Sequence, residues 1–181
     1  IALEADMTVD AAAYDGEQLI TATGDGQTLR VNYHDHIDLN TVQEPHTNIA
    51  NGSSFTRIEF HADPEEFRII AQFERSGLQY LRVFEPGERL RKVAEFGPYR
   101  VLDWQVGADA DSNGKADLKI IGGSEEDGFN TNLDYRSLRN GESVYEIGAL
   151  RGVKYIPAWL NSSPPAASDL DGCGDLEYVL L

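Results

Sequence analysis

The chain has 181 residues and a formal net charge of −16, from 31 acidic and 15 basic residues. Hydrophobic residues make up 41% of the sequence and charged residues 25%, the composition of a folded globular protein rather than a disordered one. The negative charge argues against nucleic acid and anionic membrane surfaces as partners. No apolar run approaches the roughly 20 residues of a membrane-inserted helix, and the single cysteine excludes an internal disulfide.

The first half of the sequence predicts β-strands joined by short turns. Residues 1–14 form either an edge strand or a loose lead-in. Residues 18–22 and 28–33 are β-rich runs around the turn Gly24-Asp25-Gly26, which predicts a hairpin. The polar segment 34–54 predicts a long connection. Further strands, separated by turns that contain Pro or Gly, are expected at 55–61, 67–73, 78–84 and 90–96.

The second half continues this pattern, and Asn140-Gly141 is its strongest hairpin signal. Strands are predicted at 99–106, 118–121, 133–138, 143–147 and 153–160. Apolar pairs recur at nearly regular intervals along the chain, at Leu19-Ile20, Ile69-Ile70, Ile120-Ile121 and Val179-Leu180. A period of this kind, with a meander of strands in each unit, predicts an all-β fold built from repeats.

One loop, within residues 106–123, has oxygen ligands at alternating positions. Positions 1, 3, 5 and 9 are occupied by Asp109, Asp111, Asn113 and Asp117. Gly114 follows at position 6, where a tight loop needs a residue that tolerates positive φ. Ca²⁺ takes six to eight oxygen ligands, and the backbone carbonyl of Lys115 at position 7 would add another. The alternative for the same residues is a solvated, Asx-rich turn.

Position 12 of this loop is Ile120, where an EF-hand has a bidentate Glu. Ile120 lies in a short apolar run that predicts a buried strand rather than a helix. The loop therefore leads into a β-strand, which excludes an ordinary EF-hand.

A second acidic loop, near the end of the sequence, repeats the register of the first. Positions 1, 3, 5 and 9 are occupied by Asp169, Asp171, Cys173 and Glu177. Gly174 again stands at position 6, and the apolar run 178–181 follows. Because Cys173 stands where a third oxygen ligand is expected, ion binding at this second loop is left open.

The two loops resemble the FG-GAP/VCBS type of β-propeller repeat, as in integrin α-subunit heads and many secreted lectins and adhesins. The resemblance implies D-x-D-x-[DN]-G-x-x-D loops that bind Ca²⁺ and precede the first strand of each blade. It also implies an all-β fold of propeller-type repeats, with about three blades and a closing strand. The approximate units of this single domain, residues 1–181, are 1–54, 55–98, 99–155 and 156–181.

Propellers typically have four to eight blades, and an open stack would leave strand edges unpaired. We therefore expect this chain to be part of a larger propeller, completed by more chain, by other copies or by a second chain.

No catalytic motif is visible: the sequence has no G-x-S-x-G, and no phosphate-binding Gly loop precedes a helix. The acid pairs Asp63 with Glu65 and Glu125 with Glu126 stand in turns and indicate solvated charge. Four aromatic residues suit either a sugar platform or, more commonly in β proteins, interior packing: Trp104, Tyr135, Tyr155 and Trp159.

Resemblance and charge together favour an extracellular or cell-surface module, stabilised by Ca²⁺, for adhesion, for protein or glycan binding, or for assembly. Two alternatives stay open. One is a part of a secreted polysaccharide-degrading lyase or hydrolase, and the other is a structural subunit of an extracellular filament or tip complex.

Overall fold

The computed structural model describes residues 11–15, 17–35, 40–63, 66–124, 131–150, 167–168 and 177–178. Every helix or strand element in these residues is a β-strand, so the predicted all-β class is confirmed. The described part of the chain contains no helix with the length and hydrophobicity that a membrane span requires.

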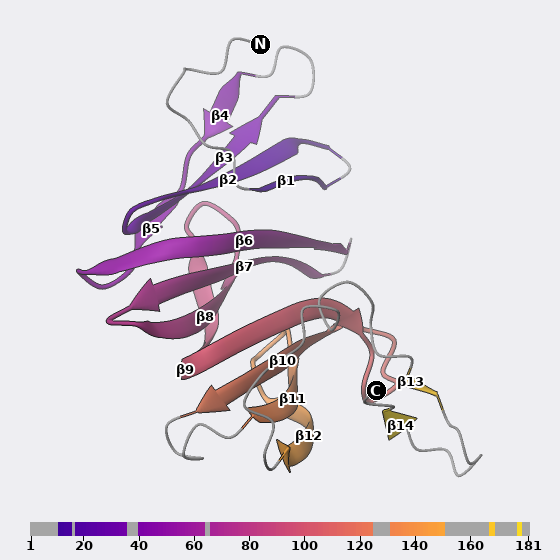
Figure 1. Ribbon diagram of the computed structural model, residues 1–181. Coiled ribbons are helices and arrows are strands. Elements are labelled where there is room, and N and C mark those ends of the chain that lie inside the picture. Colours follow the sequence, from indigo (N-terminus) through magenta and orange to yellow (C-terminus); the bar gives the residue numbers. More distant parts are fainter. Residues whose placement is uncertain are drawn as a thin grey trace.

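The first sheet is an antiparallel meander at the top of Figure 1. It consists of β1 (Ala11–Tyr14), β2 (Leu19–Asp25), β3 (Thr28–His34), β4 (Thr41–Gln43) and β5 (His46–Asn48). The hairpin predicted around Gly24-Asp25-Gly26 is confirmed as β2 and β3. The segment 34–54 is not the plain connection that was predicted. It contains β4 and β5, which both pair with β3 and so give its outer edge hydrogen-bond partners.

Two more meanders follow and share one long strand. The second consists of β6 (Ser53–Asp63), β7 (Glu66–Arg75), β8 (Leu78–Glu85) and the first half of β9 (Arg91–Ala108). The third consists of the second half of β9, β10 (Asp117–Ser124), β11 (Thr131–Ser137) and β12 (Ser143–Leu150). A separate short pair is formed by β13 (Ala167–Ser168) and β14 (Glu177–Tyr178).

The sequence predicted two strands, at 90–96 and 99–106, where β9 runs through without a break. Gly97 makes this possible: its φ is +116°, and a Cβ there would lie 2.8 Å from the carbonyl oxygen of Gln79. Just beyond it, Tyr99 pairs with Gln79 of β8 and also with Ser124 of β10. The chain therefore passes from the second meander to the third without leaving the strand.

The three meanders stack face to face, with the first and third on opposite faces of the second (Figure 1). Successive residues of β7 point to opposite faces, so Ile69 packs with Leu29 and Val31 of the first sheet. Its neighbour Ile70 packs with Leu118 and Ile120 of the third. Both isoleucines have no exposed surface. The second meander therefore supplies one face to each of two apolar cores.

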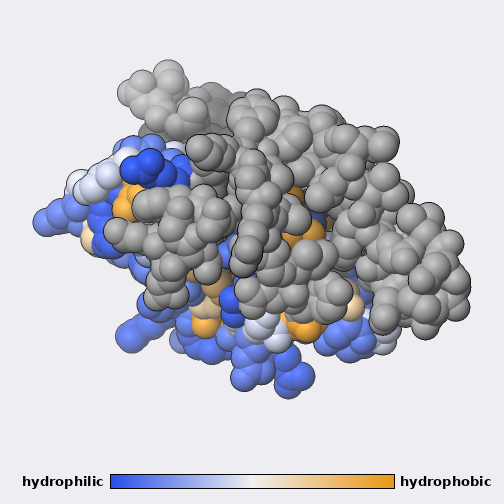
Figure 2. Space-filling view, turned by 60° about the horizontal axis from the view of Figure 1, so that its bottom comes forward, coloured by the Kyte–Doolittle hydropathy of each residue, from blue (hydrophilic) through white to orange (hydrophobic). Residues whose placement is uncertain are grey.

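The apolar pairs that defined the predicted period fall on equivalent strands. Leu19-Ile20 lies on β2, Ile69-Ile70 on β7 and Ile120-Ile121 on β10, and each of these is the second strand of its meander. The fourth pair, Val179-Leu180, lies outside the described residues. The described surface in Figure 2 is mostly hydrophilic, with small and separate apolar patches.

Candidate metal centre

The first acidic loop, residues 109–116, joins β9 to β10. These are the first and second strands of the third meander, and the loop closes at the backbone pair Ala108↔Asp117. The resemblance implied a loop that precedes the first strand of a blade, and the structure corrects this position. The segment before the loop is already the first strand of the sheet, because the second half of β9 pairs with β10 along most of its length.

Side-chain oxygens hold this loop in shape. The two carboxylate oxygens of Asp109 accept hydrogen bonds from the backbone N–H groups of Asn113, at 3.0 Å, and Gly114, at 2.8 Å. The side-chain oxygen of Asn113 accepts one from the N–H of Lys115 at 2.8 Å. Gly114 has φ +83°, as its position predicted. The loop is thus a run of Asx turns whose acceptors are the side chains proposed as ligands.

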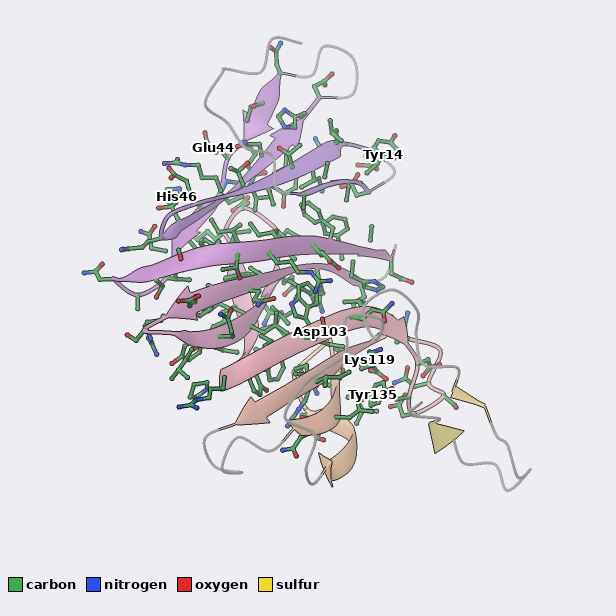
Figure 3. All side chains as sticks on the ribbon, in the orientation of Figure 1. Tyr14, Glu44, His46, Asp103, Lys119 and Tyr135 are labelled. Atoms are coloured by element: carbon green, nitrogen blue, oxygen red, sulfur yellow. The ribbon has the colours of Figure 1, made fainter. Side chains whose placement is uncertain are left out.

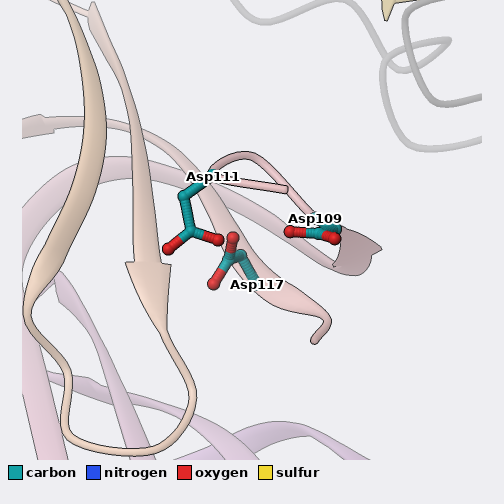
Figure 4. Close-up of side chains that lie close together, drawn as sticks. All are labelled: Asp109, Asp111 and Asp117. Atoms are coloured by element: carbon teal, nitrogen blue, oxygen red, sulfur yellow. The ribbon is translucent and has the colours of Figure 1, made fainter. Parts of the chain in front are cut away.

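Three carboxylates converge inside the loop (Figure 4). Oxygens of Asp109, Asp111 and Asp117 all lie within 4.8 Å of one another. Asp117 is 1% exposed, and its Oδ2 accepts a hydrogen bond from the N–H of Ala110 at 2.9 Å. Burial raises the pKa of Asp117. The Ala110 N–H opposes the rise, and the charges of Asp111, Asp109 and Glu66 add to it. Like charges held this close favour a bound cation.

The other predicted ligands of this loop have roles within it. The amide nitrogen of Asn113 donates to Asp111 at 2.8 Å, which ties the two side chains together. Lys115 donates its N–H to Asn113. The structure therefore brings three of the predicted side chains into one cluster and links Asn113 to it through Asp111.

The second acidic loop has the same length as the first. The pair Ser168↔Glu177 of β13 and β14 encloses eight residues, as the pair Ala108↔Asp117 does. The predicted ligands Asp169, Asp171 and Cys173 lie outside the described residues. The backbone of Glu177 begins β14, just as Asp117 begins β10. The two loops therefore correspond in strand pairing as well as in sequence.

A related correspondence links β10 to β7, and sequence reasoning missed it. β7 begins with Glu66-Phe67-Arg68 before its two isoleucines, and β10 begins with Asp117-Leu118-Lys119 before its own. Aligning the two isoleucine pairs superimposes acid on acid and cation on cation. That alignment was available in the sequence, but it has meaning only once both segments are known to be equivalent strands.

The two acids meet different surroundings. Arg68 bonds Glu66 at 3.2 Å, and both side chains are buried. Lys119 instead donates to Gln105 at 3.2 Å. Burial lowers the pKa of the Lys119 amine, and the charge of Asp103 raises it in part. Figure 3 shows Lys119, Asp103 and Tyr135 together in the third sheet. Among the described residues, no Lys or Arg lies within ion-pair distance of Asp117.

The aromatic residues of the described chain favour packing over a sugar platform. Trp104 is 1% exposed, belongs to the core between the second and third sheets, and donates its ring N–H to Gln72 at 2.8 Å. Tyr135 is also buried. The other two candidates, Tyr155 and Trp159, lie outside the described residues.

Comparison of the chain with protein-family models, curated proteins and solved structures found no match. The resemblance to FG-GAP/VCBS repeats therefore depends on the loop motifs alone.

Proposed function

We propose that this chain is an extracellular module of the calcium-stabilised β-propeller type that binds a protein or glycan partner or takes part in assembly. The observation that carries the calcium assignment is Asp117. It is buried at the start of β10 beside two further carboxylates, without a described Lys or Arg in ion-pair distance. Asp109 is half-buried and Asp111 is exposed, so the cost falls on Asp117: a buried carboxylate beside two others is unfavourable unless a cation compensates it, and oxygen donors suit Ca²⁺.

Two features support the propeller part of the proposal. Consecutive antiparallel meanders stack face to face, and the second strand of each has a pair of adjacent apolar residues, Leu-Ile in β2 and Ile-Ile in β7 and β10. The second acidic loop repeats the strand pairing of the first. In a propeller the outer faces of the end meanders would meet further blades, from more chain, other copies or a second chain.

The role of the ion in this proposal is structural. Ca²⁺ would replace the repulsion among the carboxylates with attraction and hold the β9–β10 loop in one conformation. Loops that bind Ca²⁺ with dissociation constants of about 10⁻⁴–10⁻³ M are filled outside cells. An affinity in that range would support the extracellular assignment, and sub-micromolar affinity would count against it.

Thermal unfolding with and without Ca²⁺ tests the site. Calcium at about 100 times its dissociation constant should raise the free energy of unfolding by about 2.7 kcal/mol over the value in EGTA. Asp111→Ala should abolish this difference. Asp25→Ala removes an exposed acid at the C-terminal end of β2, in a different meander from the loop, and should retain the difference. If the wild-type chain melts identically in Ca²⁺ and in EGTA, the structural-ion assignment is wrong.

A further inference from the structure

A cleft of about 610 Å³ lies between the first and second sheets. It is formed where β1 turns into β2 and where β6 turns into β7, together with residues 86–87 after β8. Its lining includes Tyr14, Asp15, Tyr33, Asp63, Phe67 and Gly87. The cleft is separate from the acidic loop, which joins β9 to β10 and contributes no lining residue.

The cleft combines aromatic rings with carboxylates. Tyr14 is 58% exposed at the end of β1, where Figure 3 labels it. Tyr33 is buried deeper. Burial raises the pKa of its hydroxyl, and the charge of Asp15 raises this pKa further. A hydrogen bond from the Gly87 backbone opposes both effects. Asp15 and Tyr33 both line the cleft.

The carboxylate of Asp15 is held in position by its own turn. Its Oδ1 accepts hydrogen bonds from the N–H groups of Glu17, at 2.9 Å, and Gln18, at 2.8 Å. Asp63, on the other side, closes the β6–β7 hairpin by pairing with Glu66. No Lys or Arg is among the described residues that line the cleft.

This combination selects a cation. Aromatic faces attract cationic groups, and a planar guanidinium both stacks on a ring and forms bidentate bonds to a carboxylate. The field of a chain with net charge −16 adds long-range attraction for a basic partner, whereas a neutral sugar gains nothing from it. We propose that the cleft receives an arginine side chain from a basic segment of a partner protein. The inference rests on the proposed binding role, but it uses a different site from the calcium loop.

Fluorescence anisotropy with a labelled tetra-arginine peptide tests this, with the whole chain in saturating Ca²⁺. The reference is the same peptide with citrulline, which keeps the planar group but has no charge. We expect the arginine peptide to bind at least about tenfold more tightly. Asp63→Asn and Tyr14→Ala should each weaken its binding about three- to tenfold. Asp25→Asn, which makes the same change in net charge at the opposite end of β2, should leave the affinity unchanged.

Three outcomes would overturn the inference. Equal losses in Asp63→Asn and Asp25→Asn would mean that the peptide senses only the net charge. Equal binding of the citrulline peptide would remove the cation from the argument. Binding of a neutral oligosaccharide that depends on Tyr14, without arginine binding, would make the cleft a glycan site.

The same assay separates this inference from the calcium proposal. If Asp111→Ala abolishes the effect of Ca²⁺ on melting while the arginine peptide still binds, both proposals stand as independent sites. If the wild type melts identically in Ca²⁺ and EGTA but the peptide binds through Asp63, only the calcium site fails. If Ca²⁺ stabilises the chain and the peptide does not bind, only the arginine cleft fails.

Discussion

The β6–β7 and β9–β10 connections occupy the same place in successive meanders, yet they differ fourfold in length. The pair Asp63↔Glu66 leaves two residues between β6 and β7, and the pair Ala108↔Asp117 leaves eight between β9 and β10. Two residues are enough to join antiparallel strands, so the strand order of the sheet does not explain the longer loop. The extra residues supply Asp109 and Asp111, two of the three carboxylates of the proposed calcium site.

The acids that follow these two connections, Glu66 and Asp117, differ in whether a cation of the chain lies beside them. Glu66 has a buried internal cation, Arg68, whose Nε also donates to the carbonyl of Leu138 in the third meander at 3.0 Å. Asp117 has carboxylates for neighbours, and the equivalent cation, Lys119, donates to Gln105 instead. We infer that the second meander neutralises its acid from within, while the third depends on a cation from solution.

The largest loss of stability in this comparison is expected from Arg68→Met. The change leaves Glu66 buried without its cation and the Leu138 carbonyl without this donor, which should cost about 3–5 kcal/mol in urea unfolding. Most of the loss should be the same in Ca²⁺ and in EGTA, because Arg68 neutralises Glu66 directly and the charge of Glu66 is only a small contribution to the pKa of Asp117.

The matched control for this prediction is Arg91→Met. It breaks the exposed ion pair with Glu85 and should cost no more than about 1 kcal/mol. Adding Glu66→Gln to Arg68→Met should restore part of the loss, since it removes the stranded charge. If the Arg68 and Arg91 variants lose equal stability, the internal half of the comparison is wrong.

The effect of Asp117→Asn on the free energy of unfolding should change sign between EGTA and Ca²⁺. Asn keeps an oxygen that can accept from Ala110, but it removes one charge from the cluster. In EGTA we expect the variant to be more stable than the wild type at neutral pH. In saturating Ca²⁺ it should be less stable, because most of the roughly 2.7 kcal/mol from ion binding is lost. A loss of equal size under both conditions would make Asp117 an ordinary structural residue.

The pH dependence of the ion-free chain follows from the raised pKa of Asp117. As pH rises above its ordinary value of 3.8, the unfolded chain releases this proton while the folded chain still holds it, so wild-type stability falls. The fall should end once the pH passes the folded-state pKa, and Asp117→Asn should lack it. Urea titrations in EGTA across this range measure the difference, and Ca²⁺ should suppress it because the ion favours the carboxylate.

How far the sequence predicted this molecule depended on how local each signal was. Alternation and turn residues were enough for β7, and Asn140-Gly141 predicted the β11–β12 turn, where the N–H of Gly141 bonds the carbonyl of Ser137. The spacing of acids within one loop was enough to predict that Asp109, Asp111 and Asp117 converge.

Features that join distant segments were not predictable in this way. The continuity of β9 depends on the close approach of Gly97 to Gln79 in the neighbouring strand. The cleft gathers Tyr14, Tyr33 and Asp63 from separate strands, and Asp63 alone had indicated no more than a solvated turn. Only the packing of the first sheet on the second brings these side chains together.

The smallest change in stability is expected from shortening the β9–β10 connection to the two residues of the β6–β7 connection. Replacing residues 109–116 by Asn-Gly would join Ala108 to Asp117 with a two-residue hairpin turn. Two halvings of loop length lower the closure entropy by about 1.2 kcal/mol in the flexible-loop limit, so the variant in EGTA should be at least as stable as the wild type. Because the variant retains Asp117 without Asp109 and Asp111, its melting should no longer respond to Ca²⁺. A variant that unfolds in both buffers would mean that the sheet needs the loop itself, and the difference in length would then reflect folding rather than ion binding.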